Sequence, residues 1–280
     1  MEDAIMSDMI SLSLKISSGR PAPRAMWAVP GDAAQEVCPM RIDDVPVSAS
    51  LADAPVRVVE RGVQVEREEH VSVASEHLLT VRADGAVLAE RSVTPEHLGP
   101  FVAGMLLSEG HVAGPGDIER ISFSDDGTEA HVTGRIASRP IAPSARDRVV
   151  PVRREDAFAL ADAMAEGLPL HRRTRAAHGA LLMCGGEILS RCEDIGRHNA
   201  LDKAIGWAMS HDVELEGALL CTTGRAPVDM VRKAVRAGVA GLVCKGAPTV
   251  EGARLAEEMR LTLIGRARPD RFEVWAGRAV

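Results

Sequence analysis

Residues 193–203 read Glu193-Asp194-Ile195-Gly196-Arg197-His198-Asn199-Ala200-Leu201-Asp202-Lys203. This polar stretch leads into an apolar pattern at helical spacing, formed by Leu201, Ile205, Ala208 and Met209. Asn199 is predicted to cap that helix, with Asp202 in its first turn, where the helix dipole favours an acid. Upstream, apolar runs on both sides of Gly185-Gly186 predict a β-hairpin. A strand-to-helix junction is therefore expected at residues 196–198.

The residue types at this junction are typical of an anion site. Free backbone N–H groups at a helix start attract anions, and Arg197 adds a fixed positive charge. This predicts that Arg197, His198 and Asn199 bind an anionic ligand. The alternative is a structural role, in which Arg197 pairs with Glu193 or Asp194 and His198 only caps the helix.

The same arrangement recurs further along the chain. A buried strand over residues 217–221 is followed by residues 222–225 and a helix that opens at Pro227. A second strand over 241–244 is followed by residues 245–248 and a helix capped by Thr249. A strand over 261–264, a loop over 265–271 and a strand over 272–275 follow. Strands that alternate with helices predict an α/β layer around a largely parallel sheet.

Ligands of such sheets bind beyond the carboxyl ends of the strands. The predicted junctions place a row of cations at that edge, formed by Arg197, Arg225, Lys245 and either Arg266 or Arg268. Gly224 and Gly246 are expected to let a ligand approach the backbone closely. A phosphate-rich ligand explains the row best. Neither a Walker loop nor a G-x-G-x-x-G fingerprint is present, so the usual ATP and NAD binding modes are not expected.

Three cysteines occupy equivalent positions, because Cys192, Cys221 and Cys244 each end a predicted strand just before a cationic junction. One interpretation is that they are small buried apolar residues, as most free cysteines are. The other is that nearby Arg and Lys side chains lower the pKa of a reactive thiol.

Composition limits the class of protein. The 280 residues are 46% apolar and carry a net charge of −7, which argues against general nucleic-acid binding. No stretch is long and apolar enough to span a membrane, and no signal peptide is recognisable, so a cytoplasmic protein is expected. The five cysteines form no disulfide framework, and no metal site is predicted. The cluster over residues 171–175 is either a solvated face or the rim of a site for an anionic ligand or a partner.

Four segments are predicted along the chain. Residues 1–40 form a flexible extension, 41–135 a β-rich N-terminal domain, 136–155 a connecting loop, and 156–280 an α/β cofactor-binding domain. Within the second segment, Thr94 is predicted to cap a helix that ends near Gly110 and buries one face, formed by Leu98, Phe101, Val102 and Met105.

Four motifs, in this order along the chain, carry a resemblance to a known family: Thr94-Pro95-Glu96 with residues 106–110, then residues 193–203, Thr223-Gly224-Arg225 and Gly246-Ala247-Pro248. On these residues the chain resembles the formate dehydrogenase accessory sulfurtransferase (sulfur carrier) family. The resemblance implies an α/β fold, with a cytidine-deaminase-like layered C-terminal domain and a smaller β-rich N-terminal domain. A homodimer is also expected.

The resemblance implies a role in molybdenum cofactor maturation. A family member takes sulfur from a cysteine desulfurase and passes it to molybdenum bis(molybdopterin guanine dinucleotide), bound as cargo, before insertion into a formate dehydrogenase-type molybdoenzyme. Six further residues near the C-terminus would contact the cofactor: Gly265, Arg266, Ala267, Arg268, Pro269 and Asp270.

The chain departs from the family in one respect. The family's persulfide-forming Cys-x-x-Cys pair is missing from residues 136–147, and no such pair occurs anywhere in the sequence. Cys192 and Cys221 are then the candidate thiols for sulfur transfer. The alternative is a cofactor-binding chaperone of the same family without sulfurtransferase activity. A zinc-dependent deaminase is excluded, because His-x-Glu and Pro-Cys-x-x-Cys are missing. A generic phosphate-ester enzyme remains open.

Overall fold

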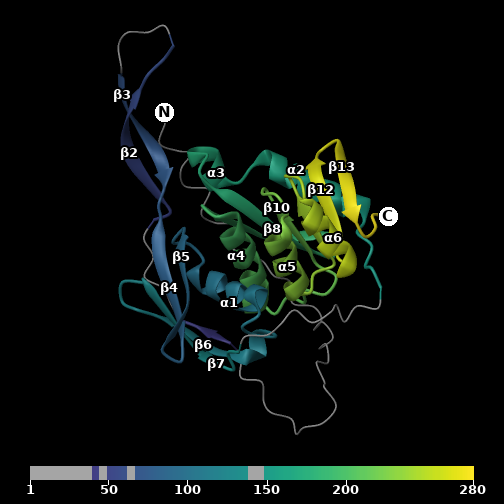
Figure 1. Cartoon of the computed structure of the whole chain (residues 1–280). Coiled ribbons are helices and arrows are strands. Elements are labelled where there is room, and N and C mark those ends of the chain that lie inside the picture. Colours follow the sequence, from purple (N-terminus) through teal and green to yellow (C-terminus); the bar gives the residue numbers. More distant parts are fainter. Residues whose placement is uncertain (1–39, 44–48, 62–66, 138–147) are drawn as a thin grey trace, which may run out of the picture. The chain divides into compact units, whose positions relative to one another are not determined.

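The computed structural model describes residues 40–43, 49–61, 67–137 and 148–280 (Figure 1). Residues 1–39 of the predicted extension and residues 138–147 of the predicted loop lie outside these ranges. None of the helices in the described ranges is long and apolar enough to cross a membrane.

The first half of the described chain is rich in strands, as predicted. One sheet has the order β1-β6-β7-β4-β5, and its strands are β1 (Arg41–Ile42), β4 (His77–Ala83), β5 (Ala86–Val93), β6 (Ile118–Phe123) and β7 (Glu129–Gly134). A separate antiparallel ribbon joins β2 (Leu51–Val58) to β3 (Arg67–Ala74). Helix α1 (Leu98–Glu109) follows β5, and a short 3-10 turn, η1 (Pro115–Asp117), precedes β6.

The second half contains a six-stranded sheet of order β13-β12-β11-β10-β8-β9. Its strands are β8 (His178–Cys184), β9 (Glu187–Asp194), β10 (Leu219–Thr222), β11 (Gly241–Cys244), β12 (Thr262–Arg268) and β13 (Arg271–Ala276). The layered α/β class is confirmed, but the prediction of a largely parallel sheet is wrong. Only β10, β11 and β12 pair in parallel, because tight turns at residues 185–186 and 269–270 fold the flanking strands back as hairpins.

Helices cover both faces of this sheet (Figure 1). On one face, Leu181 and Met183 share a core with α2 (Arg154–Glu166). On the other, Leu182 shares a core with α1 and with three further helices: α4 (Arg197–Ser210), α5 (Val228–Ala237) and α6 (Val250–Glu258). A short helix, α3 (Pro169–Thr174), precedes β8. One continuous core therefore joins residues from both halves of the chain, and the predicted domain boundaries stay a prediction.

Several predicted element ends are corrected by the structure. Helix α4 begins at Arg197 behind Gly196, so Asn199 is not its cap and Asp202 lies beyond its first turn. Helix α1 begins after His97 rather than at Thr94. Strand β12 runs through Arg268, which removes most of the predicted loop 265–271. In contrast, Thr249 caps α6 as predicted, and its side chain accepts a hydrogen bond from the Gly252 N–H.

Helices α1 and α4 cross in direct backbone contact. A Cβ atom at Gly206 would lie 1.7 Å from the Pro100 carbonyl oxygen, and one at Gly104 would lie 1.8 Å from the Asp202 carbonyl oxygen. Neither backbone atom can move without displacing its helix, so this crossing requires glycine at both positions. The contact brings α1 against the helix that begins at Arg197.

We predict that Gly206→Ala destabilises the fold, because overpacking costs about 1–3 kcal/mol and here exceeds the gain of about 1 kcal/mol in helix propensity. Urea denaturation measures the change in free energy of unfolding. Gly114→Ala is the control, because a Cβ there has no atom within 4 Å, and it should change stability by less than about 0.5 kcal/mol. Equal stability of the two variants would contradict the close crossing.

Candidate functional site

Four strands of the six-stranded sheet end at the same edge. Strand β9 is antiparallel to β8, which is antiparallel to β10, so β9 runs in the direction of β10, β11 and β12. The connections after β10 and β11 are hydrogen-bonded side by side, because the Gly246 N–H donates to the Gly224 carbonyl at 3.0 Å. Arg266, near the end of β12, continues the row, and its N–H donates to the Gly246 carbonyl at 2.8 Å. The junction after β9 joins them through the Arg197 side chain, which packs against Gly224.

Three cations of this edge have no acidic partner among the described residues, whereas Arg266 forms an ion pair with the Glu273 carboxylate at 3.3 Å. Within the described ranges, no carboxylate forms an ion pair with Arg197, Arg225 or Lys245. Glu193 accepts hydrogen bonds from the backbone N–H groups of Leu170 and His171 at the start of α3, both at 2.8 Å. Asp194 pairs with Lys203 instead. The structural alternative, in which Arg197 pairs with one of these acids, is therefore wrong.

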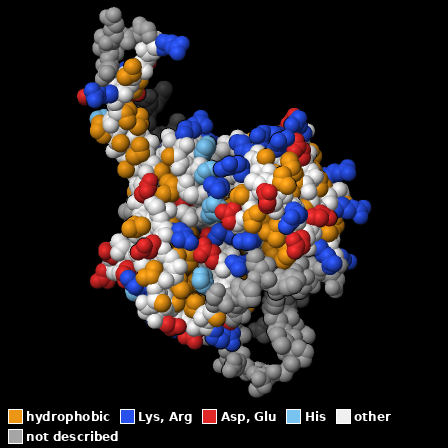
Figure 2. Space-filling view, in the orientation of Figure 1, with side chains coloured by type: hydrophobic (Ala, Val, Ile, Leu, Met, Phe, Trp, Pro, Cys, Tyr) orange, Lys and Arg blue, Asp and Glu red, His pale blue; other side chains and the backbone are white. Residues whose placement is uncertain are grey.

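The Arg197 side chain retains an unused donor. Its Nε atom is buried and has no hydrogen-bond partner among the described residues. An unsatisfied buried donor costs about 1–3 kcal/mol, so a ligand oxygen that accepts from it would be favoured. Figure 2 shows Lys, Arg and His side chains gathered along the middle of one face of the molecule.

The two junction glycines have another role than the predicted one. A Cβ at Gly224 would lie 2.8 Å from the Arg197 Cδ, so the arginine side chain fills that space. A Cβ at Gly246 would lie 2.7 Å from the Gly224 carbonyl oxygen and 2.9 Å from the Arg225 backbone. These glycines let the junctions and Arg197 pack on one another, rather than leaving room for a ligand to approach.

The residues predicted at the start of α4 separate into two groups. His198 is half-buried, and its Nε2 lies 2.7 Å from the Asp229 carboxylate in the first turn of α5. Burial lowers the pKa of His198, and the Asp229 charge opposes that shift. Asn199 is buried and donates to the Ser92 carbonyl and to Asp194, both at 2.8 Å. Asn199 therefore belongs to the scaffold of the site.

The predicted segment 265–270 also divides. Gly265 and Ala267 are buried, and Ala267 packs in the core beneath α2. The other four residues of the segment 265–270 are exposed: Arg266, Arg268, Pro269 and Asp270. The Arg268 guanidinium donates to the Lys245 carbonyl at 2.6 Å, which holds this hairpin against the edge.

The candidate thiols Cys192 and Cys221 are not accessible. Both side chains are 1% exposed, and Cys244 is fully buried. Burial raises the pKa of Cys192 to about 11 and that of Cys244 to about 12, and it raises the pKa of Cys221 as well. The expectation of a reactive thiol at these positions is therefore wrong, and the buried apolar interpretation holds. Cys184 is half-buried at the opposite edge of the sheet, and Cys38 lies outside the described residues.

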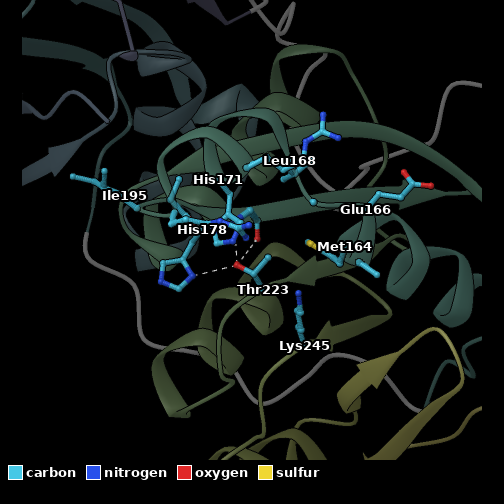
Figure 3. A pocket seen from close by; sticks show the side chains of 15 residues that line it. Met164, Glu166, Leu168, His171, His178, Ile195, Thr223 and Lys245 are labelled. Atoms are coloured by element: carbon cyan, nitrogen blue, oxygen red, sulfur yellow. Dashed lines mark hydrogen bonds between the residues drawn. The ribbon is translucent and has the colours of Figure 1, made fainter. Parts of the chain in front are cut away.

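A cavity of about 620 Å³ opens beside the edge and was not predicted (Figure 3). Its lining includes His171, His178, Thr223 and Lys245, together with Arg172 and Arg175. His178 Nδ1 lies 3.2 Å from the Thr223 hydroxyl. Burial lowers the pKa of His178, and the Arg197 charge adds to that shift. The cluster over residues 171–175 thus contributes to the rim of a basic cavity.

Sequence reasoning missed His178 because it considered only the carboxyl ends of the strands. Strand β8 runs opposite to its neighbours, so its first residue reaches the edge where the other strands end. The Gly185-Gly186 turn, which predicts a hairpin, was the signal that could have placed His178 there.

A buried ion pair holds the start of α4 in place. Lys203 Nζ lies 2.7 Å from the Asp194 carboxylate, and neither side chain is exposed. Asp194 also accepts from the backbone N–H groups of Thr94 and Gly196, both at 2.9 Å. Lys203 donates to the Thr94 carbonyl at 3.0 Å. Burial lowers the pKa of Lys203, and the Asp194 charge opposes that shift.

Comparisons with known proteins agree on one family. A family model described as the FdhD/NarQ family matches residues 137–279. Sulfur carrier protein FdhD of Listeria innocua is 28% identical over 250 residues, which cover 79% of this chain and 95% of that protein. Sulfur carrier protein FdhD of Methanothermobacter thermautotrophicus is 30% identical over 213 residues, covering 70% and 86%. A crystal structure from Desulfotalea psychrophila, described as a formate dehydrogenase accessory protein, has a TM-score of 0.71 at 25% identity and covers 81% of this chain and 97% of that one.

We predict that Lys203→Met lowers the free energy of unfolding by about 3–5 kcal/mol, because it leaves the buried Asp194 carboxylate without its counter-ion. Urea denaturation followed by circular dichroism measures the loss. Adding Asp194→Asn to this variant should restore part of the stability, since the uncompensated charge is then removed. A single variant as stable as the wild type would show that the pair does not hold the junction.

Proposed function

The chain belongs to the FdhD/NarQ family, and we propose that it assists the maturation of a formate dehydrogenase-type molybdoenzyme by holding that enzyme's molybdenum bis(molybdopterin guanine dinucleotide) as cargo. The names of its relatives, a sulfur carrier and a formate dehydrogenase accessory protein, support this role. The observation that carries the proposal is the row of Arg197, Arg225 and Lys245 along one sheet edge, none of them paired with a carboxylate of the described chain.

The chemistry of the edge suits a guanine dinucleotide cofactor. The diphosphates of such a ligand are anions that accept hydrogen bonds from planar guanidinium groups, and Lys245 adds a compact point charge. Strands β10 and β12 are separated by one strand, so their ends lie about 10 Å apart. This span accommodates a diphosphate at one end and the rest of a nucleotide at the other. The Arg197 Nε has no partner among the described residues, so an acceptor oxygen that reached it would satisfy a buried donor.

Sulfur transfer is a separate question from cofactor holding. A thiol that carries sulfur must be accessible as a thiolate, attack a persulfide and then release its sulfur. Cys192 and Cys221 are buried with raised pKa values, and residues 136–147 contain no cysteine. These observations favour a cofactor-holding chaperone.

The names of the relatives favour the second candidate, a sulfur carrier that receives sulfur from a cysteine desulfurase. The third hypothesis, a generic phosphate-ester enzyme, has no support from the site, since no group of metal-ligating side chains occurs in the described residues. A cytoplasmic location and a homodimer stay predictions.

The proposed cargo predicts binding of guanosine diphosphate, a fragment of the cofactor. In isothermal titration calorimetry, the double variant Arg197→Ala, Arg225→Ala should bind at least tenfold more weakly than the wild type, because each charged hydrogen bond contributes about 1.5–3 kcal/mol. A double variant at two exposed arginines away from the edge, Arg120→Ala with Arg154→Ala, is the control and should bind as the wild type does. Equal binding by both double variants would refute the proposed site.

The chaperone role predicts that the folded chain takes up no sulfur. We would incubate it with a cysteine desulfurase and cysteine, and then search each cysteine peptide for a gain of about 32 Da, the mass of one sulfur atom. Alkylation of the unfolded chain is the control that all five cysteines are detected. A sulfur adduct on any cysteine that forms only with the desulfurase would instead support the sulfur carrier.

A further inference from the structure

An exposed tryptophan lies beside the cationic edge. The chain has three tryptophans and no tyrosine. Trp207 in α4 stacks on His211, with ring centres 4.0 Å apart, whereas Trp275 in β13 is 36% exposed. The Arg266 guanidinium carbon lies over the Trp275 ring, 5.8 Å from its centre, in a cation–π arrangement. The function proposed above uses neither Arg266 nor this aromatic ring.

The indole is fitted against the junction that follows β11. A Cβ at Gly265 would lie 2.8 Å from the Trp275 Nε1 and 2.4 Å from the Pro248 Cδ. The indole edge and the proline ring therefore both pack against β12 at Gly265, where the strand has no side chain. Pro248 belongs to the same connection as Lys245 and Gly246. Trp275 therefore lies at one end of the cationic edge.

Arg266 reaches the indole through an unusual backbone conformation. Its φ is +48°, in the left-handed region that non-glycine residues seldom adopt, and the β12–β13 register shifts between Gly265 and Arg268. Such bulges re-aim side chains, and strained residues of this kind cluster at ligand sites. Its backbone N–H is held by the Gly246 carbonyl, so the bulge is tied to the edge.

We propose that Trp275 and Arg266 form the platform on which a nucleobase of the bound cofactor stacks; this rests on the cofactor-holding function proposed above. An indole face stacks on any base, and a neighbouring guanidinium strengthens the contact through its charge. Arg225 follows β10, which is two strand spacings, or about 10 Å, from β12. The Arg197 side chain packs against Gly224 of the same junction, so both arginines can hold the phosphates while the base stacks at the β12–β13 end of the edge.

The test compares guanosine diphosphate with inorganic pyrophosphate, which has no base, in isothermal titration calorimetry of the full chain. Trp275→Leu should weaken the binding of guanosine diphosphate about tenfold or more and leave that of pyrophosphate unchanged, because only the stacking contact is lost. Trp275→Phe should retain most of the affinity. Trp207→Phe is the matched control and should bind both ligands as the wild type does. Circular dichroism confirms that each variant is folded.

Each other outcome has a distinct meaning. Unchanged binding of guanosine diphosphate by Trp275→Leu overturns the platform and leaves the cationic edge intact. An equal loss for both ligands assigns Trp275 a role in holding the edge, which also overturns the platform. If the wild type binds neither ligand, the cofactor-holding function fails and the platform fails with it.

Discussion

The arrangement of the edge depends on the buried ion pair between Asp194 and Lys203. Burying two charges is costly unless every remaining donor and acceptor is satisfied. Here Thr94 and Gly196 supply the additional partners of the carboxylate, and the Thr94 carbonyl accepts from the ammonium group. Because Asp194 is committed in this way, it cannot neutralise Arg197, which lies three residues further on. Arg197 has no acidic partner because the more deeply buried Lys203 pairs with the nearest acid.

A second buried ion pair, between Lys233 and Asp202, connects α5 to α4. Lys233 of α5 lies 2.8 Å from the Asp202 carboxylate of α4 and donates to the Ser108 hydroxyl of α1 at 2.9 Å. Burial raises the pKa of Asp202, and the Lys233 charge opposes that shift. With the glycine contact between α1 and α4, these polar links tie the first half of the chain to the helices that start at the edge. The five-stranded sheet and α1 thus position the site without contributing a predicted ligand-binding residue.

Local rules predicted the elements better than the uses of their polar residues. The Gly185-Gly186 turn and the cap at Thr249 were correct because both depend on backbone geometry within a few residues. Asn199 and Thr94 are equally good caps by composition, yet both side chains belong to the buried cluster around Asp194 and Lys203, whose members are up to 109 residues apart. No pattern within one helix contains that information. The prediction of reactive thiols was wrong for the same reason. Cations that are close in sequence lower the pKa of a cysteine only where burial does not outweigh them, and at Cys192 and Cys221 burial raises the pKa.

Holding a cofactor and carrying sulfur have different structural requirements, so the proposed cofactor-holding role does not need the residues of sulfur transfer. Holding requires fixed cations, and here they are fixed by buried pairs and by junctions that pack on one another through Gly224 and Gly246. Carrying sulfur requires only an exposed thiolate that can approach two partners in turn. Every contact described above that fixes the cations comes from outside residues 138–147. The proposed anion site therefore does not depend on the two cysteines that the family resemblance implies for that segment and that this sequence lacks.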